Sequence, residues 1–195
     1  MRKLTYFIAC SVDGFIGDPD GDASEMISLL DEEFLEYLRT ERADTLPTAA
    51  RRAFGIDERP NDQYDTVIQG RGSYEVGLKE GITSPYAHLR QYVASRSLGE
   101  SPDPAVEIVS GDVVARIREL KAEDGGLGIY LCGGAQLAGQ LFDEIDELVI
   151  KTYPLAYGTG MPMFGGTGAD IARFALDEVR AFGNGILVRT YSRKR

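Results

Sequence analysis

The sequence predicts an α/β fold in which helices flank a mostly parallel central sheet, with an antiparallel hairpin strand at the C-terminus. Two observations predict it. Short apolar runs typical of buried strands alternate along the chain with segments whose apolar residues recur at helical spacing. Near the C-terminus, two strand-like segments flank Gly183-Asn184-Gly185, a strong hairpin signal. The alternation favours parallel pairing, and the hairpin adds an antiparallel edge.

Each expected element follows from its local pattern. The apolar run at 4–10 predicts the first strand, and the aspartate-rich stretch at 18–22 predicts a turn-rich loop. Further strands are expected at 65–69, 92–94, 106–109, 129–132, 145–153, 174–182 and 186–191. Helices are expected at 31–40, around 74–78, at 113–121 and around 137–142. Residues 154–166 combine glycine, proline and apolar residues, which indicates a packed loop.

Residues 41–63 have the least regular pattern. A short helix fits 48–54, but Pro47, Gly55 and Pro60 interrupt the segment. We interpret it as a loop-rich excursion that shapes a substrate pocket or a subunit contact, with Arg51 and Arg52 as a candidate basic patch. A surface insertion without function is the alternative.

Composition excludes several classes of protein. The 195 residues, 43% of them hydrophobic, fit one domain over 1–195. No stretch is long enough to span a bilayer and no signal-peptide cleavage site follows Met1, so we expect a cytoplasmic protein without a membrane partner. Cys10 and Cys132 lie in apolar runs, which is typical of reduced core residues. The single histidine, His88, argues against a zinc site, and the net charge of −10 argues against a nucleic-acid partner.

The strongest candidate for a ligand site is Gly133-Gly134, which separates the strand at 129–132 from a helix start. Glycines let the backbone approach a ligand closely, and the first turn of a helix offers unpaired N–H groups to an anion. The alternative is tight packing between strand and helix.

Two further segments repeat this arrangement of polar groups after a strand. Gly70-Arg71-Gly72-Ser73 follows the strand at 65–69, and its guanidinium and hydroxyl suit phosphate oxygens. Ser95-Arg96-Ser97 follows the strand at 92–94, at the strand end where ligands bind in open α/β sheets. The alternatives are an ordinary surface cation at Arg71 and a polar loop at 95–97.

Asp13 is the carboxylate that we expect to lie nearest to the reacting atoms of a substrate. It follows the first strand within Ser11-x-Asp13-Gly14, whereas the aspartates of 18–22 are more simply explained as solvated turn formers. The Asp13 carboxylate could hydrogen-bond a substrate or assist proton delivery. The alternative is that it braces its own loop.

In combination, these segments resemble the dihydrofolate reductase-like superfamily. The similarity is greatest to the reductase domain at the C-terminus of the bifunctional riboflavin-biosynthesis deaminase/reductase. It covers nearly the whole chain and is weakest over 41–63. The motifs that carry it are Ser11-x-Asp13-Gly14, Gly70-Arg71-x-Ser73-Tyr74-Glu75, Ser95-Arg96-Ser97, Gly133-Gly134-Ala135-Gln136-Leu137, Pro154-Leu155 and Gly158-x-Gly160-x-Pro162-Met163-Phe164.

The resemblance implies an NADPH cofactor and a homodimer. It assigns the pyrophosphate to Gly133, Gly134, Ala135, Gln136 and Leu137, with Gly70, Arg71, Gly72 and Ser73 on the other side of the cofactor. By the same resemblance, Ser95 and Arg96 meet the adenosine 2′-phosphate, which favours NADPH over NADH. The resemblance also implies that the backbone near Ala9, together with Ile16 and Gly17, would lie along the nicotinamide.

The chain departs from its relatives in two respects, and these limit the function that the resemblance implies. The deaminase signature His-x-Glu with Pro-Cys-x-x-Cys is absent, and no acid maps on the carboxylate that dihydrofolate reductases place beside the pterin. We therefore expect an NADPH-dependent reductase of a small heterocyclic or carbonyl/imine substrate. One alternative is a ribosylamino-pyrimidine or pteridine reductase. Another is a nucleotide-binding or structural protein that keeps the fold without turnover.

Overall fold

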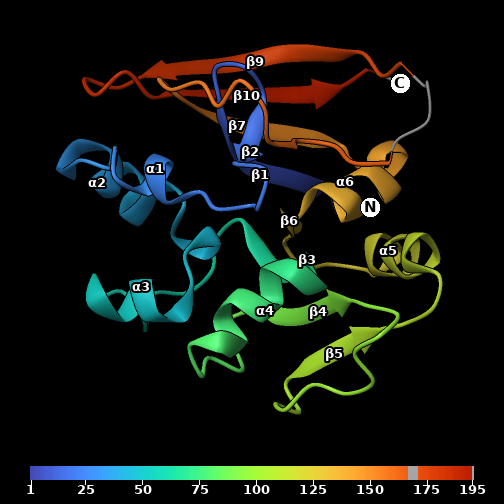
Figure 1. Ribbon diagram of the computed structural model, residues 1–195. Helices are drawn as coiled ribbons and strands as arrows, with labels where there is room; N and C mark the ends of the chain where they lie inside the picture. Colours follow the sequence, from blue (N-terminus) through green and yellow to red (C-terminus); the bar gives the residue numbers. More distant parts are fainter. Residues whose placement is uncertain (167–170, 195) are drawn as a thin grey trace.

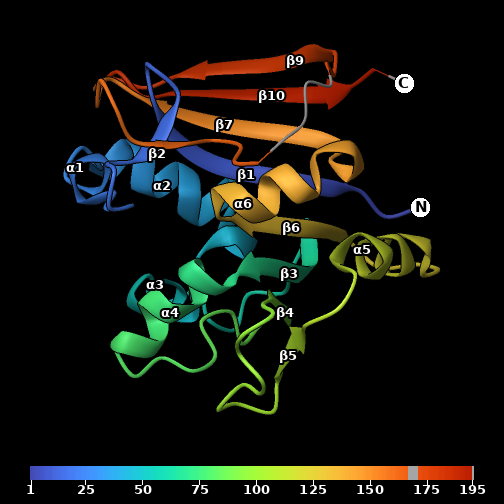
Figure 2. The same ribbon diagram turned by 45° about the vertical axis from the view of Figure 1, so that its right-hand side comes forward.

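A computed structural model of the chain, in which residues 1–166 and 171–194 are described, contains an eight-stranded sheet (Figure 1). The strand order is β5-β4-β3-β6-β1-β7-β10-β9, and Figure 2 shows the sheet running from β5 at the bottom to β9 at the top. Pairing is parallel from β5 to β7 and antiparallel across β7, β10 and β9. The predicted fold class, with its antiparallel C-terminal edge, is confirmed. The strands are β1 Leu4–Ser11, β3 Tyr64–Gly70, β4 Arg90–Ala94, β5 Val106–Val109, β6 Gly128–Gly133, β7 Glu147–Tyr153, β9 Phe174–Ala181 and β10 Leu187–Arg193.

Helices cover both faces of this sheet. The first three lie on the left in Figure 1, and α5 and α6 lie on the right. Aromatic side chains of α2 pack into one core cluster, whereas α5 and α6 supply apolar side chains to the other. The helices are α1 Ser24–Ile27, α2 Glu32–Glu41, α3 Thr48–Ala53, α4 Arg71–Lys79, α5 Val113–Ala122 and α6 Ala135–Gln140, with short 3₁₀ turns at Ala43–Thr45 and Phe142–Glu144.

The central strand β1 shows why the core has two halves. Successive strand residues point to opposite faces. Tyr6 and Cys10 therefore enter the cluster beneath α5 and α6, while Phe7 enters the cluster beneath α2. A strand buried on both faces must be apolar throughout, which explains the continuous hydrophobic run that predicted it.

Acidic residues fix the starts of the two ten-residue helices. Asp31 precedes α2, and its carboxylate accepts the Phe34 N–H at 2.9 Å. Asp112 precedes α5 and accepts the Ala115 N–H at 3.0 Å. Each carboxylate satisfies an N–H group that lacks a partner within the helix, as expected for an N-cap.

The segment between α2 and β3 contains α3, where the sequence allowed a short helix over 48–54. Arg51 is only 1% exposed, so the predicted basic patch at Arg51 is wrong. The Arg51 guanidinium lies 3.6 Å from the equally buried Asp44 carboxylate and donates to the Ala43 carbonyl. The other Asp44 oxygen accepts the N–H groups of 62–64. A buried charge needs such partners, and here they tie the segment to β3.

A second small sheet was not predicted. It pairs β2 (Phe15–Gly17) with β8 (Met161–Pro162) in antiparallel fashion. β8 lies inside the expected packed loop at 154–166, whose Met163 and Phe164 pack against the core as predicted. Strands of two or three residues are too short to show the periodicity on which the prediction relied.

Candidate active site

The motifs that follow the strands meet at one edge of the parallel sheet. Gly70 pairs with Ala94, Gln69 pairs with Gly133, and Ser11 pairs with Tyr153. The carboxyl ends of β4, β3 and β6 are therefore level with one another, and the ends of β1 and β7 lie at the same edge of the sheet. This edge is the usual ligand-binding edge of an open α/β sheet.

Two strand–glycine–helix junctions touch at this edge. A Cβ atom added to Gly70 would lie 3.4 Å from the Gly134 nitrogen and 3.6 Å from the Gly133 carbonyl oxygen. Gly133 has a φ of +117°, which side chains disfavour, and the peptide bond to Gly134 is cis. Gly134 has an ordinary φ of −85°, and a Cβ there would meet only the Ser73 hydroxyl, at 3.8 Å. The space beside Gly134 is therefore open to a ligand.

The residues around this space fit a pyrophosphate. The N-cap positions of α4 and α6 are Gly70 and Gly134, and neither helix has a side-chain cap. Uncapped N–H groups in a first turn are available to an anion. Since α6 has only six residues, we assign its contribution to direct N–H contacts rather than to a helix dipole.

Two side chains of α6 point into the core, so only the backbone of these two residues is available to such a ligand, whereas Gln136 is exposed. Ala135 and Leu137 are buried in the core. The Ala135 carbonyl accepts the Gly165 N–H, and a Cβ added to Gly165 would lie 2.8 Å from the Gln136 amide nitrogen. The loop at 154–166 thus packs over the helix and holds it against β6.

Polar groups from two connections meet beside the glycine junctions. Arg71 donates to the Ser97 hydroxyl at 2.6 Å and lies 3.5 Å from the Glu75 carboxylate. The buried Ser95 hydroxyl accepts the N–H groups of Ser97 and Leu98 and keeps its own hydrogen for another acceptor. Arg96 is exposed and has no hydrogen bond or ion pair with the described residues. The structure thus brings the predicted phosphate-binding groups of 70–73 and 95–97 together.

Asp13 is held by its own loop. Its carboxylate accepts the Ser11 hydroxyl at 2.5 Å and the N–H groups of Gly158 and Tyr157 at 2.7 and 3.3 Å. The Ser11 hydroxyl, followed by these backbone groups, keeps the pKa of Asp13 below its ordinary value. The structure shows the bracing contacts that the sequence left as an alternative, and a role toward substrate stays a prediction.

The residues expected beside the nicotinamide lie close to Asp13. Ala9 is half-buried near the carboxyl end of β1, and Ile16 and Gly17 belong to β2. A Cβ on Gly17 would lie 3.0 Å from the Asp22 carbonyl oxygen, so the adjoining turn packs directly on this glycine. Gly17 therefore has a structural role whether or not a cofactor lies along it.

The model of the RibD C-terminal domain family matches residues 2–188 of the chain. The chain belongs to this family. YwjB of Bacillus subtilis (strain 168), an uncharacterized protein, is 32% identical over 168 residues, which are 84% of this chain and 83% of YwjB. The resemblance inferred from the motifs is confirmed.

Solved structures agree with this membership. The "putative riboflavin biosynthesis protein" of Shewanella sp. PV-4 matches over the whole length of both chains, with 26% identity and a TM-score of 0.74. The diaminohydroxyphosphoribosylaminopyrimidine deaminase/5-amino-6-(5-phosphoribosylamino)uracil reductase of Thermotoga maritima matches 99% of this chain with 18% identity and a TM-score of 0.65. The match covers 57% of the Thermotoga protein, and at this identity it shows a shared fold.

In this RibD C-terminal family member, one polar residue close to the expected nicotinamide position was not singled out from the sequence. Lys151 of β7 pairs with Ala9 of β1, and its ammonium lies 4.1 Å from the centre of the Phe7 ring. Its signal in the sequence was a lysine in an alternating strand where Val149 and Tyr153 occupy the same face. We had interpreted that strand only as part of the sheet.

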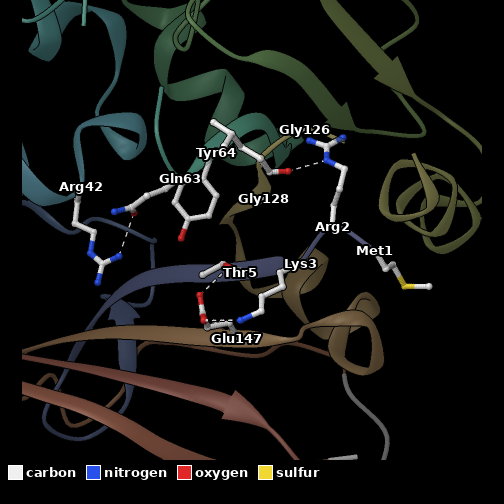
Figure 3. Close-up of a pocket in the computed structure, with 11 residues that line it drawn as sticks. Met1, Arg2, Lys3, Thr5, Arg42, Gln63, Tyr64, Gly126, Gly128 and Glu147 are labelled. Carbon is white, nitrogen blue, oxygen red and sulfur yellow. Dashed lines mark hydrogen bonds and ion pairs between the residues drawn. The ribbon is translucent and has the colours of Figure 1, made fainter. Parts of the chain in front are cut away.

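A cavity of about 360 Å³ lies at the opposite end of the sheet, where β1, β3, β6 and β7 begin (Figure 3). Arg2, which lines it, is paired with Asp65 and Glu123, and Lys3 lies 3.6 Å from the Glu147 carboxylate. Because these cations already have anionic partners and lie far from the strand ends that carry the motifs, we do not assign the cofactor to this cavity. Within the described residues, no group of three or more His, Cys, Asp or Glu side chains could hold a metal ion, and no helix could cross a membrane.

Proposed function

We propose that the chain is an NADPH-dependent reductase that acts on a small heterocyclic or carbonyl/imine substrate. The observation that carries the proposal is the contact between the glycine junctions at Gly70 and Gly133-Gly134. The open space beside Gly134 adjoins Ser73, and the cations of Arg71 and Arg96 flank the neighbouring connection.

The comparisons support a reductase. The Thermotoga protein that shares the fold is named as a 5-amino-6-(5-phosphoribosylamino)uracil reductase, and the Shewanella protein is named for riboflavin biosynthesis. These names favour a reductase of the riboflavin-pathway type. A ribosylamino-pyrimidine or a related pteridine is therefore the second candidate substrate.

When bound, NADPH supplies the hydride, and the residues of the chain bind and orient it. Backbone N–H groups at the two glycine junctions would bind the pyrophosphate. The hydroxyl of Ser95 and the guanidinium of Arg96 would bind the adenosine 2′-phosphate. Local cations are needed here because the chain carries a net charge of −10, which repels a phosphorylated ligand. Ala9, Ile16 and Gly17 would position the nicotinamide.

Calorimetric titration of the purified chain with NADPH and NADH tests the proposal. We expect saturable 1:1 binding of NADPH and at least about tenfold weaker binding of NADH, because a charged hydrogen bond contributes about 1.5–3 kcal/mol. Oxidation of NADPH with a carbonyl, an imine or a ribosylamino-pyrimidine then separates the substrate classes. Failure to bind either nucleotide would refute the proposal, whereas binding without turnover of any probe would favour the non-catalytic alternative.

A further inference from the structure

Lys151 lies in the middle of the sheet rather than at its surface. It is in register with Ala9, and it alternates with Ile150 and Thr152, which face the other side of β7. Val149 and Tyr153, its neighbours on the same face, belong to the core cluster beneath α2. Lys151 is therefore on the α2 face, near the carboxyl end of β1.

The surroundings of Lys151 are apolar and aromatic. The ammonium lies over the Phe7 ring, and the other titratable groups that act on it are the thiols of Cys10 and Cys132. The Tyr86 hydroxyl lies 3.4 Å from the Cys132 sulfur, and Tyr130 packs in the same cluster. Lys151 has no hydrogen bond or ion pair with any residue of 1–166 or 171–194, and no carboxylate lies within ion-pairing distance of it there.

Lys121 is a buried lysine of the same molecule whose ammonium does have polar partners. Lys121 is buried, at 3% exposure, whereas Lys151 is half-buried, and the Lys121 ammonium lies 2.6 Å from the Asp146 carboxylate and donates to the Glu144 carbonyl at 2.8 Å. Buried lysines are normally paired in this way, since an unpaired buried charge is costly. An enclosed lysine without a partner therefore calls for a functional explanation.

Burial lowers the pKa of Lys151 to about 8, because the ammonium loses hydration without gaining an anionic partner. An acid with a pKa close to the working pH is largely protonated and still gives up its proton readily. Asp13, the other candidate, has its carboxylate oxygens engaged by Ser11, Tyr157 and Gly158 and is held in the ionised form.

We propose that Lys151 is the catalytic acid of this reductase, donating a hydrogen bond and then a proton to the nitrogen or oxygen atom of the substrate's C=N or C=O group. The inference rests on the proposed function, because it needs the nicotinamide near Ala9, with which Lys151 is in register. The substrate class follows from the charge of Lys151. A neutral acceptor atom is attracted to the ammonium, whereas an already protonated iminium would be repelled.

The atoms and electrons of this step balance. The substrate carbon accepts the hydride that NADPH supplies, and the π electrons of the double bond move to the heteroatom. The heteroatom then takes a proton from the Lys151 ammonium. The products are an amine or alcohol, NADP⁺ and a neutral Lys151 amine, which regains its proton from water.

NMR of protein carrying ¹³C-lysine tests the position of Lys151 without turnover. The chain has five lysines, and Lys151→Met identifies the signal that belongs to position 151. We expect NADP⁺ to shift this signal and lower the pKa of Lys151, since the oxidised nicotinamide is cationic. Adenosine 2′,5′-bisphosphate, which lacks the nicotinamide, should leave both unchanged. A Lys151 signal that NADP⁺ does not move, in protein saturated with it, overturns the inference whether or not any substrate is reduced.

Thermal unfolding provides a second readout that separates a catalytic from a structural lysine. Removing an unpaired buried charge should stabilise the protein, so we expect Lys151→Met to raise the Tm at pH 7 by about 3 °C or more. Lys121→Met is the matched control and should lower the Tm. The unfolded chain binds more protons than the folded one between pH 8 and 10.5, so the parent should gain stability relative to Lys151→Met across that window. A lower Tm for Lys151→Met would indicate a structural role and overturn the inference.

Turnover completes the test, with 4-nitrobenzaldehyde and 2-methyl-1-pyrroline as carbonyl and imine probes. We expect Lys151→Met to bind NADPH within about twofold of the parent and to lose about 10²-fold or more in kcat. NADPH binding with unchanged kcat in the variant would overturn the role of Lys151 and leave the proposed function intact. If the parent binds no NADPH, the proposed function fails and the inference fails with it.

Discussion

At the scale of single residues, Arg96 has the clearest assignment among the candidate site residues. Its side chain is exposed and has no partner within the described residues, so its removal should not disturb the fold. We expect Arg96→Ala to weaken NADPH binding by about tenfold or more, the value of one charged hydrogen bond, and to leave NADH binding nearly unchanged. Calorimetric titration with both nucleotides measures the difference.

Arg52→Ala is the matched control for this prediction. Arg52 is also exposed and unpartnered in the described part of the chain, but it lies on α3, away from the glycine junctions. The two substitutions change the net charge equally. Comparable losses of NADPH affinity in both variants would show a general charge effect and remove the assignment of Arg96.

Asp13→Asn distinguishes the two roles that the sequence allowed for Asp13. The structure leads us to expect a lower Tm and little change in kcat, because an amide has only one acceptor oxygen for the groups that the carboxylate now holds. The folded pKa is lowered, so the stabilisation should be present at pH 7 and disappear as the pH falls below 3.8. Thermal scans at several pH values measure this. A kcat reduced about 10²-fold at unchanged Tm would instead support the catalytic prediction.

At the scale of elements, a substitution at Gly134 tests whether the junction between β6 and α6 binds the cofactor. A side chain there has room in the protein and an allowed φ, but it would occupy the space that we assign to the pyrophosphate. We therefore expect Gly134→Val to abolish NADPH binding while the protein remains folded. Gly111→Val, which adds the same side chain in open space before α5, is the control. Normal NADPH affinity in folded Gly134→Val would show that the glycine pair serves packing alone.

The same elements show which structural features could be predicted from the sequence and which could not. Buried strands such as β1 and β7 and the capped helix α5 were predicted because their patterns are local and long enough to be periodic. The glycine junctions were found because their glycines directly follow such strands in the sequence. Arg51 was misinterpreted because its partner, Asp44, is met only in the folded chain. Lys151 was missed because its surroundings come from Phe7 and Cys132, on other strands.

At the scale of the whole molecule, one face of the antiparallel edge carries three exposed apolar side chains. Val188 points into the core, so Leu187 faces the opposite side of β10. Residues directly opposite in neighbouring strands share a face. The register, with Leu176 opposite Tyr191 and Val179 opposite Arg189, places Leu176, Val179 and Leu187 on one face. They are 55%, 53% and 37% exposed, and β9 is the last strand of the sheet.

This surface is where we expect the homodimer implied by the resemblance to form, because an exposed apolar edge strand favours association with another chain. The double variant Leu176→Lys/Val179→Lys should convert a dimer to a monomer in size-exclusion chromatography with light scattering. It should still bind NADPH, since the glycine junctions lie on β3 and β6, several strands away. Val76→Lys, at another exposed apolar residue, is the control and should remain dimeric. A monomeric parent would contradict the homodimer, and a dimeric double variant would place the interface elsewhere.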